Sequence, residues 1–184
     1  FSSDSHIVGI GLKGQVPDHL RTKCWMYFPE SDCPFYRVTV FSNYSPANVP
    51  DAKLNWSLMC ETSSSAHKPV DERGLLEQTI QGLLNTNLIK TRNEIVSTWS
   101  YRASPGYPTP TLNRDEIVRA ALAEFAKHGI YSRGRFGAWK YEVSNQDHTF
   151  MQGFEWADWY LRGLEEDTVF HPSKVNAPGK RGRR

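Results

Sequence analysis

The sequence predicts an α+β fold in which a mostly antiparallel sheet is flanked by helices. Aromatic and β-branched residues gather in short runs, separated by turn residues, in the first third of the chain. Longer stretches further along repeat apolar residues at three- and four-residue spacing, which is the pattern of amphipathic helices. The chain has 184 residues, 39% hydrophobic and 23% charged. That is enough for one domain with a sizeable core, or for a piece of a larger domain.

Strands are expected along the first hundred residues. Residues 6–12 predict a strand that runs into glycines. Residues 24–28 and 35–44 are rich in aromatic and β-branched side chains, and the link between them has turn chemistry, so the two runs predict a hairpin. Residues 54–62 alternate apolar side chains on one face, and residues 94–101 predict a later strand.

Two helices are expected in the middle of the chain, at 71–88 and from Asn113 to the glycine at position 129. Asp71 can cap the first helix, and Asn113 with Glu116 forms a capping-box-like pair at the start of the second. Each helix carries an apolar stripe, made of Leu76, Ile80, Leu83 and Leu84 in the first and of Ile117, Ala121, Leu122 and Phe125 in the second.

The remaining segments connect these elements and complete the fold. Prolines at positions 105, 108 and 110 predict an extended loop, because proline fixes φ and disfavours helix in the residue before it. Residues 131–139 predict a short strand with a glycine-rich turn. A last helix is expected over 147–164. Its apolar face consists of Phe150, Phe154, Ala157, Leu161 and Leu164.

Composition excludes several classes of protein. The cysteines Cys24, Cys33 and Cys60 are odd in number and form no CxxC pair, so a reduced intracellular protein is favoured over a disulfide scaffold or a zinc finger. No apolar run approaches the roughly 20 residues needed to span a bilayer. Five basic residues and no acid follow Phe170. That basic segment lacks interleaved aromatic residues, so a solvated tail is favoured over a nucleic-acid contact.

Two familiar patterns do not support a site. Gly9, Gly11 and Gly14 match GxGxxG, but no helix with an apolar stripe follows them, so a strand end or bend is favoured over a dinucleotide site. The histidines lack metal-ligand spacing, and Asp147 with His148 at a helix start is more often a cap with a surface residue. No metal is expected.

Residues 132–148 contain a stronger signal. A glycine-rich loop leads into a helix N-terminus, where unpaired N–H groups and the helix dipole favour an anion. Arg133, Arg135 and Lys140 add positive charge. An ordinary strand-to-helix connection with surface arginines explains the same pattern equally well, so the physics alone leaves both interpretations open.

Two further clusters carry groups suited to phosphate. Tyr27 and Arg37 lie on adjacent strands of the expected hairpin, and arginine offers a planar fork of charge-assisted hydrogen bonds. A stiff proline-containing loop can present Tyr107. Each cluster alone also fits a bland interpretation, a core strand pair with an exposed arginine in the first case and a plain loop in the second.

Taken together, the three clusters resemble UDP-galactopyranose mutases of the fungal and protozoan type. The matching segments run KCWMYFPESDCPFYRVTVFSNYSP, EIVSTWSYRASPGYPTPTL and SRGRFGAWKYEVSNQDHTFMQG. The resemblance implies interconversion of UDP-galactopyranose and UDP-galactofuranose through a covalent adduct with N5 of reduced FAD, so no side chain is expected to be the catalytic nucleophile. It also implies NAD(P)H as the flavin reductant, a cytoplasmic enzyme of cell wall biosynthesis, and a homo-oligomer as one expected assembly.

The resemblance also implies roles for individual residues. Arg37, Tyr27, Tyr107 and Tyr141 match the groups that bind the substrate diphosphate, and Trp25 matches an aromatic residue that lines the sugar pocket. Flavin contacts are implied for three residues, namely Arg135, Asn145 and Gln146. Ser144 stands where the family typically has glycine.

The family's N-terminal Rossmann fingerprint and helical substrate domain are not found in this sequence. We therefore expect a sheet-rich substrate-side region at 1–128, the C-terminal strand and helix of a Rossmann-type FAD domain at 129–166, and a basic, disordered tail at 167–184. The isolated chain is expected to be inactive. An FAD-dependent amine oxidase or protoporphyrinogen-oxidase-like enzyme, and a non-catalytic truncated paralogue acting as an interaction module, are the alternatives.

Overall fold

A computed structural model describes residues 1–177. The last seven residues of the expected tail, 178–184, lie outside the described residues. The chain divides into two compact units, one comprising Ser2–Gly106 and the other comprising Phe1 with Tyr107 onward. The expected limit at 128–129 therefore lies inside the second unit, which contains the second expected helix as well as the third.

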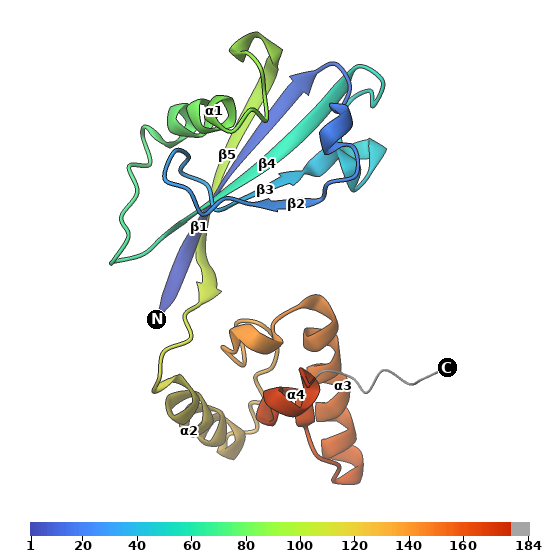
Figure 1. The fold of residues 1–184 in the computed structure, drawn as a ribbon. Coiled ribbons are helices and arrows are strands. Elements are labelled where there is room, and N and C mark those ends of the chain that lie inside the picture. Colours follow the sequence, from blue (N-terminus) through green and yellow to red (C-terminus); the bar gives the residue numbers. More distant parts are fainter. Residues whose placement is uncertain (178–184) are drawn as a thin grey trace. The chain divides into compact units, whose positions relative to one another are not determined.

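The first unit is built on one five-stranded sheet with the order β2-β3-β4-β1-β5 (Figure 1). The strands are β1 (Ser2–Lys13), β2 (Trp25–Tyr27), β3 (Arg37–Val40), β4 (Asn55–Ser64) and β5 (Ile95–Pro108). The hairpin predicted for β2 and β3 is confirmed as an antiparallel pair, and β4 is antiparallel to both of its neighbours. Short 3-10 turns η1 to η4 span Asp18–Leu20, Phe41–Asn43, Pro46–Asn48 and Arg92–Glu94.

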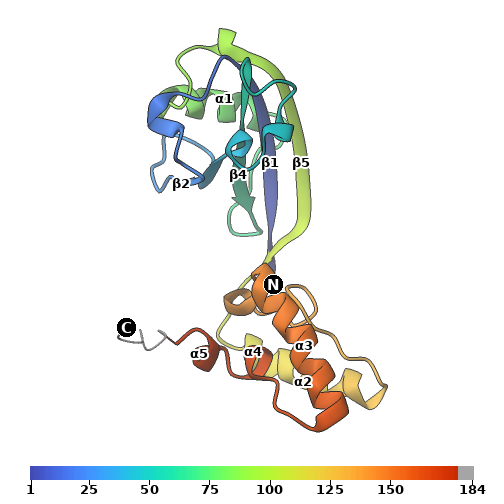
Figure 2. The same ribbon diagram turned by 90° about the vertical axis from the view of Figure 1, so that its right-hand side faces the viewer.

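The core of this unit lies between the sheet and helix α1 (Leu75–Asn85), which packs on one sheet face (Figure 2). Val8 pairs with Cys60 across β1 and β4, and strand alternation sends every second residue of both strands into this core. The largest fully buried members are Trp56, Phe35, Ile10, Leu12, Leu58 and Leu83. Burying each such side chain contributes about 1.5–3 kcal/mol.

Two expectations about this unit were wrong. Helix α1 begins at Leu75 instead of residue 71, because Asp71 accepts a 3.1 Å hydrogen bond from the Arg73 N–H and closes a turn ahead of the helix. The loop expected at the prolines is strand up to Pro108. Strand β5 is an edge strand, where proline is tolerated because one side of the backbone needs no ladder partner. Gly9 and Gly11 lie inside β1, as the strand interpretation required.

The second unit is helical within the described residues. It contains α2 (Arg114–Lys127), the 3-10 turn η5 (Tyr141–Val143), α3 (Gln146–Arg162), α4 (Asp167–Phe170) and α5 (Pro172–Val175). No strand forms at 131–139, because Gly134 adopts a φ of +89° and Gly137 lies so close to the Arg133 carbonyl that the chain turns sharply. The tail expected to be disordered forms α4 and α5, since Val169 is fully buried.

The apolar stripes predicted for α2 and α3 face largely outward. Of the α2 stripe only Leu122 is buried, and Arg114 and Val118 are the other buried residues of this helix. On α3 the buried residue is Gln152, while Phe150 is 72% exposed. Apolar surfaces of this kind commonly mark an interaction site. No helix among the described residues is long and apolar enough to cross a membrane.

The surroundings of two helix glycines, Gly82 in α1 and Gly153 in α3, predict opposite effects of Gly→Ala substitution. A Cβ on Gly82 would lie 2.8 Å from the Cβ of Cys33 and 3.0 Å from the ring of Phe35. We expect Gly82→Ala to destabilise the fold by about 1–3 kcal/mol, the usual cost of overpacking. Gly153 lies within α3, and a Cβ at that position would meet no atom within 4 Å, so Gly153→Ala should stabilise by up to about 1 kcal/mol. Denaturant unfolding measures both, and equal effects would contradict this packing.

Candidate functional site

The predicted binding residues of the first unit form one surface patch on β2 and β3. Tyr27 lies directly opposite Arg37, and Trp25 lies opposite Thr39. Residues two apart on a strand point to the same face, so Trp25 and Tyr27 share a face with Arg37. The Arg37 guanidinium lies 5.6 Å from the centroid of the Trp25 ring. Trp25 and Tyr27 are both exposed. We call Trp25, Tyr27 and Arg37 the β2–β3 patch.

Glu61 on β4 fixes the arginine of this patch, and the sequence analysis did not identify it. Arg37 donates from Nε to Glu61 Oε1 at 2.7 Å and from Nη2 to Oε2 at 2.6 Å. The Tyr36 hydroxyl donates to the same carboxylate at 3.0 Å. Glu61 is only 5% exposed, and a buried carboxylate needs such partners. Alternation places Glu61 on the face away from the core, but the register that sets it beside Arg37 was not predictable.

A second cluster lies in the second unit and is called the tyrosine–arginine cluster. The rings of Tyr107 and Tyr141 meet edge to face with centroids 5.9 Å apart. The Arg135 guanidinium lies 5.0 Å from the Tyr107 centroid, and its Nε donates to the Ser144 carbonyl at 3.0 Å. The Ser144 hydroxyl donates to the Tyr141 carbonyl at 2.8 Å. Three predicted site residues, Tyr107, Arg135 and Tyr141, therefore lie together.

The tyrosine–arginine cluster adjoins the start of α3. Asn145 is the N-cap and Gln146 the first helical residue, and both side chains are exposed. The first helical hydrogen bond runs from the Thr149 N–H to the Asn145 carbonyl, so earlier N–H groups point outward from a 17-residue helix. Ser144, which replaces the expected glycine, has a φ of −113° that any L-residue adopts without strain.

Buried polar contacts hold this loop, and they involve residues that were assigned other roles or none. The buried Gln152 accepts from the Gly134 N–H and donates to the Val143 carbonyl, both at 2.8 Å. Arg133, expected to add positive charge to an anion site, makes two 2.6 Å bonds to the buried Glu166 instead. Lys140 is also buried, and its pKa is lowered by that burial. Nothing in the sequence distinguishes Gln152 from a surface glutamine.

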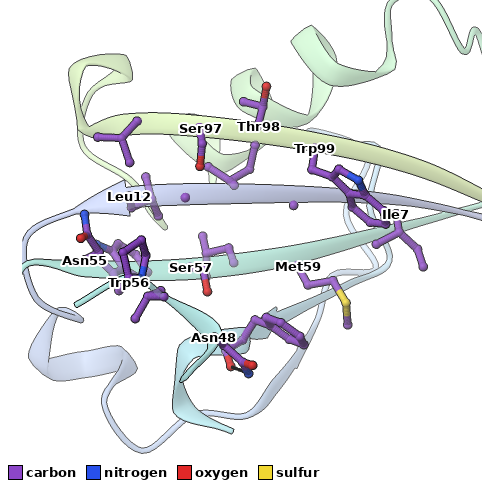
Figure 3. Close-up of a pocket in the computed structure, with 18 residues that line it drawn as sticks. Ile7, Leu12, Asn48, Asn55, Trp56, Ser57, Met59, Ser97, Thr98 and Trp99 are labelled. Atoms are coloured by element: carbon purple, nitrogen blue, oxygen red, sulfur yellow. Dashed lines mark hydrogen bonds between the residues drawn. The ribbon is translucent and has the colours of Figure 1, made fainter. Parts of the chain in front are cut away.

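The sheet face opposite α1 also carries a groove of about 430 Å³ (Figure 3). Gly9 and Gly11 form part of its floor, and Val96, Ser97 and Trp99 of β5 line one side. A side chain on Gly11 would collide with the Ser97 hydroxyl. Gly11 of the GxGxxG pattern therefore serves close packing between β1 and β5, whereas Gly14 follows the end of β1 with a φ of +96°.

The β2–β3 patch and the tyrosine–arginine cluster belong to different units of the chain. Within each unit the predicted residues lie close together. Convergence of Arg37 with all three tyrosines on one pocket stays a prediction.

The chain is similar to solved structures of a mutase and of an oxidase. No protein-family model matches the chain. A crystal structure of reduced UDP-galactopyranose mutase is 51% identical, with a TM-score of 0.89, and the match covers 96% of this chain and 37% of the mutase chain. A putative protoporphyrinogen oxidase from Exiguobacterium sp. 255-15 is 14% identical over 71% of this chain and 29% of its own, with a TM-score of 0.54. That second match shows a shared fold only.

The fold thus matches a segment of a mixed α/β flavoprotein mutase fold, and the oxidase shares that fold. Within that class the chain is similar, over nearly its whole length, to UDP-galactopyranose mutase, which confirms the resemblance carried by the three motifs. The chain spans little more than a third of the length of the mutase that it matches.

The Arg37–Glu61 pair predicts a non-additive stability cycle. Arg37→Met leaves the Glu61 carboxylate buried without its guanidinium, which should cost about 3–5 kcal/mol. The double variant Arg37→Met/Glu61→Leu removes both charges and should recover most of that loss. Denaturant unfolding of the two single variants, the double variant and the parent gives the coupling. Additive losses would show that the pair is not formed.

Proposed function

We propose that this chain is the part of a UDP-galactopyranose mutase that supplies substrate-diphosphate and flavin contacts, and that it acts together with the rest of the mutase fold. The single observation that supports this proposal is the 51% identity to a mutase over 96% of the chain. The whole enzyme would interconvert UDP-galactopyranose and UDP-galactofuranose. The chain alone, at 37% of the mutase length, would be inactive.

The geometry of both clusters suits a nucleoside diphosphate. The Tyr107 and Tyr141 rings are in contact, so their two hydroxyls can donate to neighbouring phosphate oxygens. Arg37 would add charge-assisted hydrogen bonds, worth about 1.5–3 kcal/mol each when the acceptor is charged. Glu61 already neutralises part of the Arg37 charge. Arg37 would therefore contribute mainly by holding its N–H donors in a fixed direction, and less by electrostatic attraction to the diphosphate. Trp25 and Tyr27 would border the sugar.

The start of α3 fits a flavin. Outward N–H groups, the exposed amides of Asn145 and Gln146, and the nearby Arg135 are donors that suit the electron-rich edge of a reduced flavin ring. The helix dipole would favour negative charge there by about 0.3–2 kcal/mol. When bound in its reduced form, FAD would supply the nucleophilic nitrogen of the reaction. The residues of this chain would orient the substrate and stabilise the departing diphosphate.

The cellular setting follows from the same proposal. The flavin would be reduced by NAD(P)H, and the enzyme would work in the cytoplasm as a supplier of UDP-galactofuranose for cell wall biosynthesis. A homo-oligomer is part of the proposed assembly.

A second candidate function is supported by the apolar faces of α2 and α3. Ile117, Phe125, Phe150, Phe154 and Leu161 are 45–75% exposed. A free-standing chain with such faces would act as an interaction module that binds a polypeptide through them. The oxidase alternative has weaker support, because an amine oxidase has no use for an arginine and three tyrosines suited to a diphosphate.

A chimera tests the proposed activity. The 184-residue chain would replace the matching segment of the structurally characterised mutase. With reduced flavin, the chimera should interconvert UDP-galactopyranose and UDP-galactofuranose, measured by chromatography of the nucleotide sugars. The parent mutase is the control. A folded chimera that binds flavin and shows no interconversion would refute the proposed function.

Removing single hydroxyls tests the assignment of the phenols. In that chimera, Tyr107→Phe and Tyr141→Phe keep the ring contact and delete one hydrogen bond each, so the UDP dissociation constant should rise about tenfold or more. The flavin absorbance spectrum should not change. Tyr160→Phe is the matched control, since Tyr160 is 64% exposed on α3 and lies against Trp156 instead. Calorimetric titration with UDP would decide, and unchanged affinity in both variants would contradict the assignment.

A further inference from the structure

Tyr107 and Tyr141 meet although they lie far apart in the chain, and their ring contact is too weak to fix them. Tyr107 lies near the end of β5, and Tyr141 begins the turn η5. An edge-to-face ring pair contributes only about 0.5–1.5 kcal/mol beyond its buried area. Tyr141 is 53% exposed, so its own packing does not hold it firmly. Another interaction must set the distance between the two segments that carry these phenols.

Arg114 joins these two segments. It is the first residue of α2 and follows the proline-rich stretch that begins at Tyr107. Its side chain is only 10% exposed. Nη1 donates to Glu142 Oε2 at 2.8 Å and Nη2 donates to Oε1 at 2.6 Å, so the contact between the guanidinium and the carboxylate is bidentate. Glu142 directly follows Tyr141. The pair therefore ties the Tyr107 side of the cluster to the Tyr141 side.

The turn that carries Tyr141 has further supports, which run to other parts of the same unit. The Asn176 side-chain amide donates to the Glu142 carbonyl at 2.9 Å. Gln152 binds the Val143 carbonyl, and the Ser144 hydroxyl binds the Tyr141 carbonyl. These bonds hold η5 against α3 and the C-terminal residues. The Arg114–Glu142 pair differs from them because it joins η5 to the start of α2.

Arg114 binds two acids, and its contact with Glu142 is the one that connects α2 to η5. Arg114, Arg119 and Lys140 gather near two acids, Asp115 and Glu142. Lys140 is buried, and that burial lowers its pKa. Arg114 also donates to Asp115 Oδ1 at 3.1 Å and 2.7 Å, and this hydrogen bonding lowers the pKa of Asp115. Asp115 neighbours Arg114 in sequence, so that contact does not connect α2 to η5.

We infer that Arg114 and Glu142 are positioning residues for substrate binding, which set Tyr141 at the correct distance from Tyr107. This inference rests on the proposed function, because the diphosphate is the ligand that both phenols would bind. Neither Arg114 nor Glu142 is placed in contact with substrate. They would affect UDP binding by setting the position of the Tyr141 phenol.

A double-mutant cycle in the chimera tests this route. Glu142→Gln keeps the side-chain shape and removes the charge. It should weaken UDP binding roughly tenfold and lower the turnover rate by up to about a hundredfold. These are the effects expected when a binding group is slightly misplaced. In a Tyr141→Phe background the same substitution should change UDP affinity less than about twofold, since the phenol it positions is already gone. The flavin spectrum should stay the same throughout.

The controls separate positioning from general stability. Asp115→Asn removes the other acid bound to the same guanidinium and should leave UDP affinity within about twofold of the parent. Arg114→Gln should reproduce the loss seen with Glu142→Gln, and thermal unfolding followed through the flavin confirms that each variant is folded. If Arg114→Gln does not fold, the Glu142→Gln cycle alone decides.

The outcomes are distinct. If Glu142→Gln lowers UDP affinity equally in the parent chimera and in the Tyr141→Phe background, or lowers it in neither, the positioning role is overturned while the proposed function stays intact. A parent chimera that binds flavin and fails to bind UDP would instead overturn the proposed function, and the positioning role with it.

Discussion

Three largely buried arginines among the described residues each form an ion pair with a glutamate distant in sequence, and each pair supports a segment that carries predicted binding residues. Arg37 holds Glu61 under the β2–β3 patch, Arg114 holds Glu142 beside Tyr141, and Arg133 holds Glu166 at the base of the glycine-rich loop. The partners lie 24, 28 and 33 residues apart. A planar guanidinium donates paired hydrogen bonds to a carboxylate in few orientations. Each pair therefore fixes the distance and the relative orientation of the two segments that it joins.

Replacing buried ion pairs by apolar residues of similar size is often neutral or stabilising, because removing two charges from water is expensive. Their use here fits the proposed function, in which the surface near the diphosphate would stay polar. An apolar core under Arg37 would stabilise β3 and β4 equally well, but it would not hold the Arg37 guanidinium in a fixed direction. The same reasoning applies to Gln152, whose amide satisfies two backbone groups of the loop in the interior of the second unit. The polar contacts therefore specify geometry, while the sheet core contributes most of the stability.

Much of the fold follows from local pattern, and the errors have identifiable causes. The strands and the hairpin were predictable because alternation and turn chemistry act within a few residues. The strand expected at 131–139 was wrong because Gly134 and Gly137 turn the backbone. The disorder expected at 167–177 was wrong because Val169 finds a buried site that only the folded unit provides. The predicted site residues came from motif resemblance, and their roles stay a prediction. The contacts of Glu61 and Gln152 depend on register and packing, which the sequence does not encode locally.

The exposed apolar faces and the two clusters point to the same physical arrangement. The mostly exposed apolar face of α3 is not explained by the packing of its own unit. The outward N–H groups at its first turn, which water can satisfy, are likewise available to an electron-rich ligand. Both features are satisfied if a further polypeptide layer covers the apolar faces and brings an electron-rich cofactor to the helix start. The polar groups then become a binding site only when that layer excludes water, since hydrogen bonds to a charged ligand strengthen as the local dielectric falls.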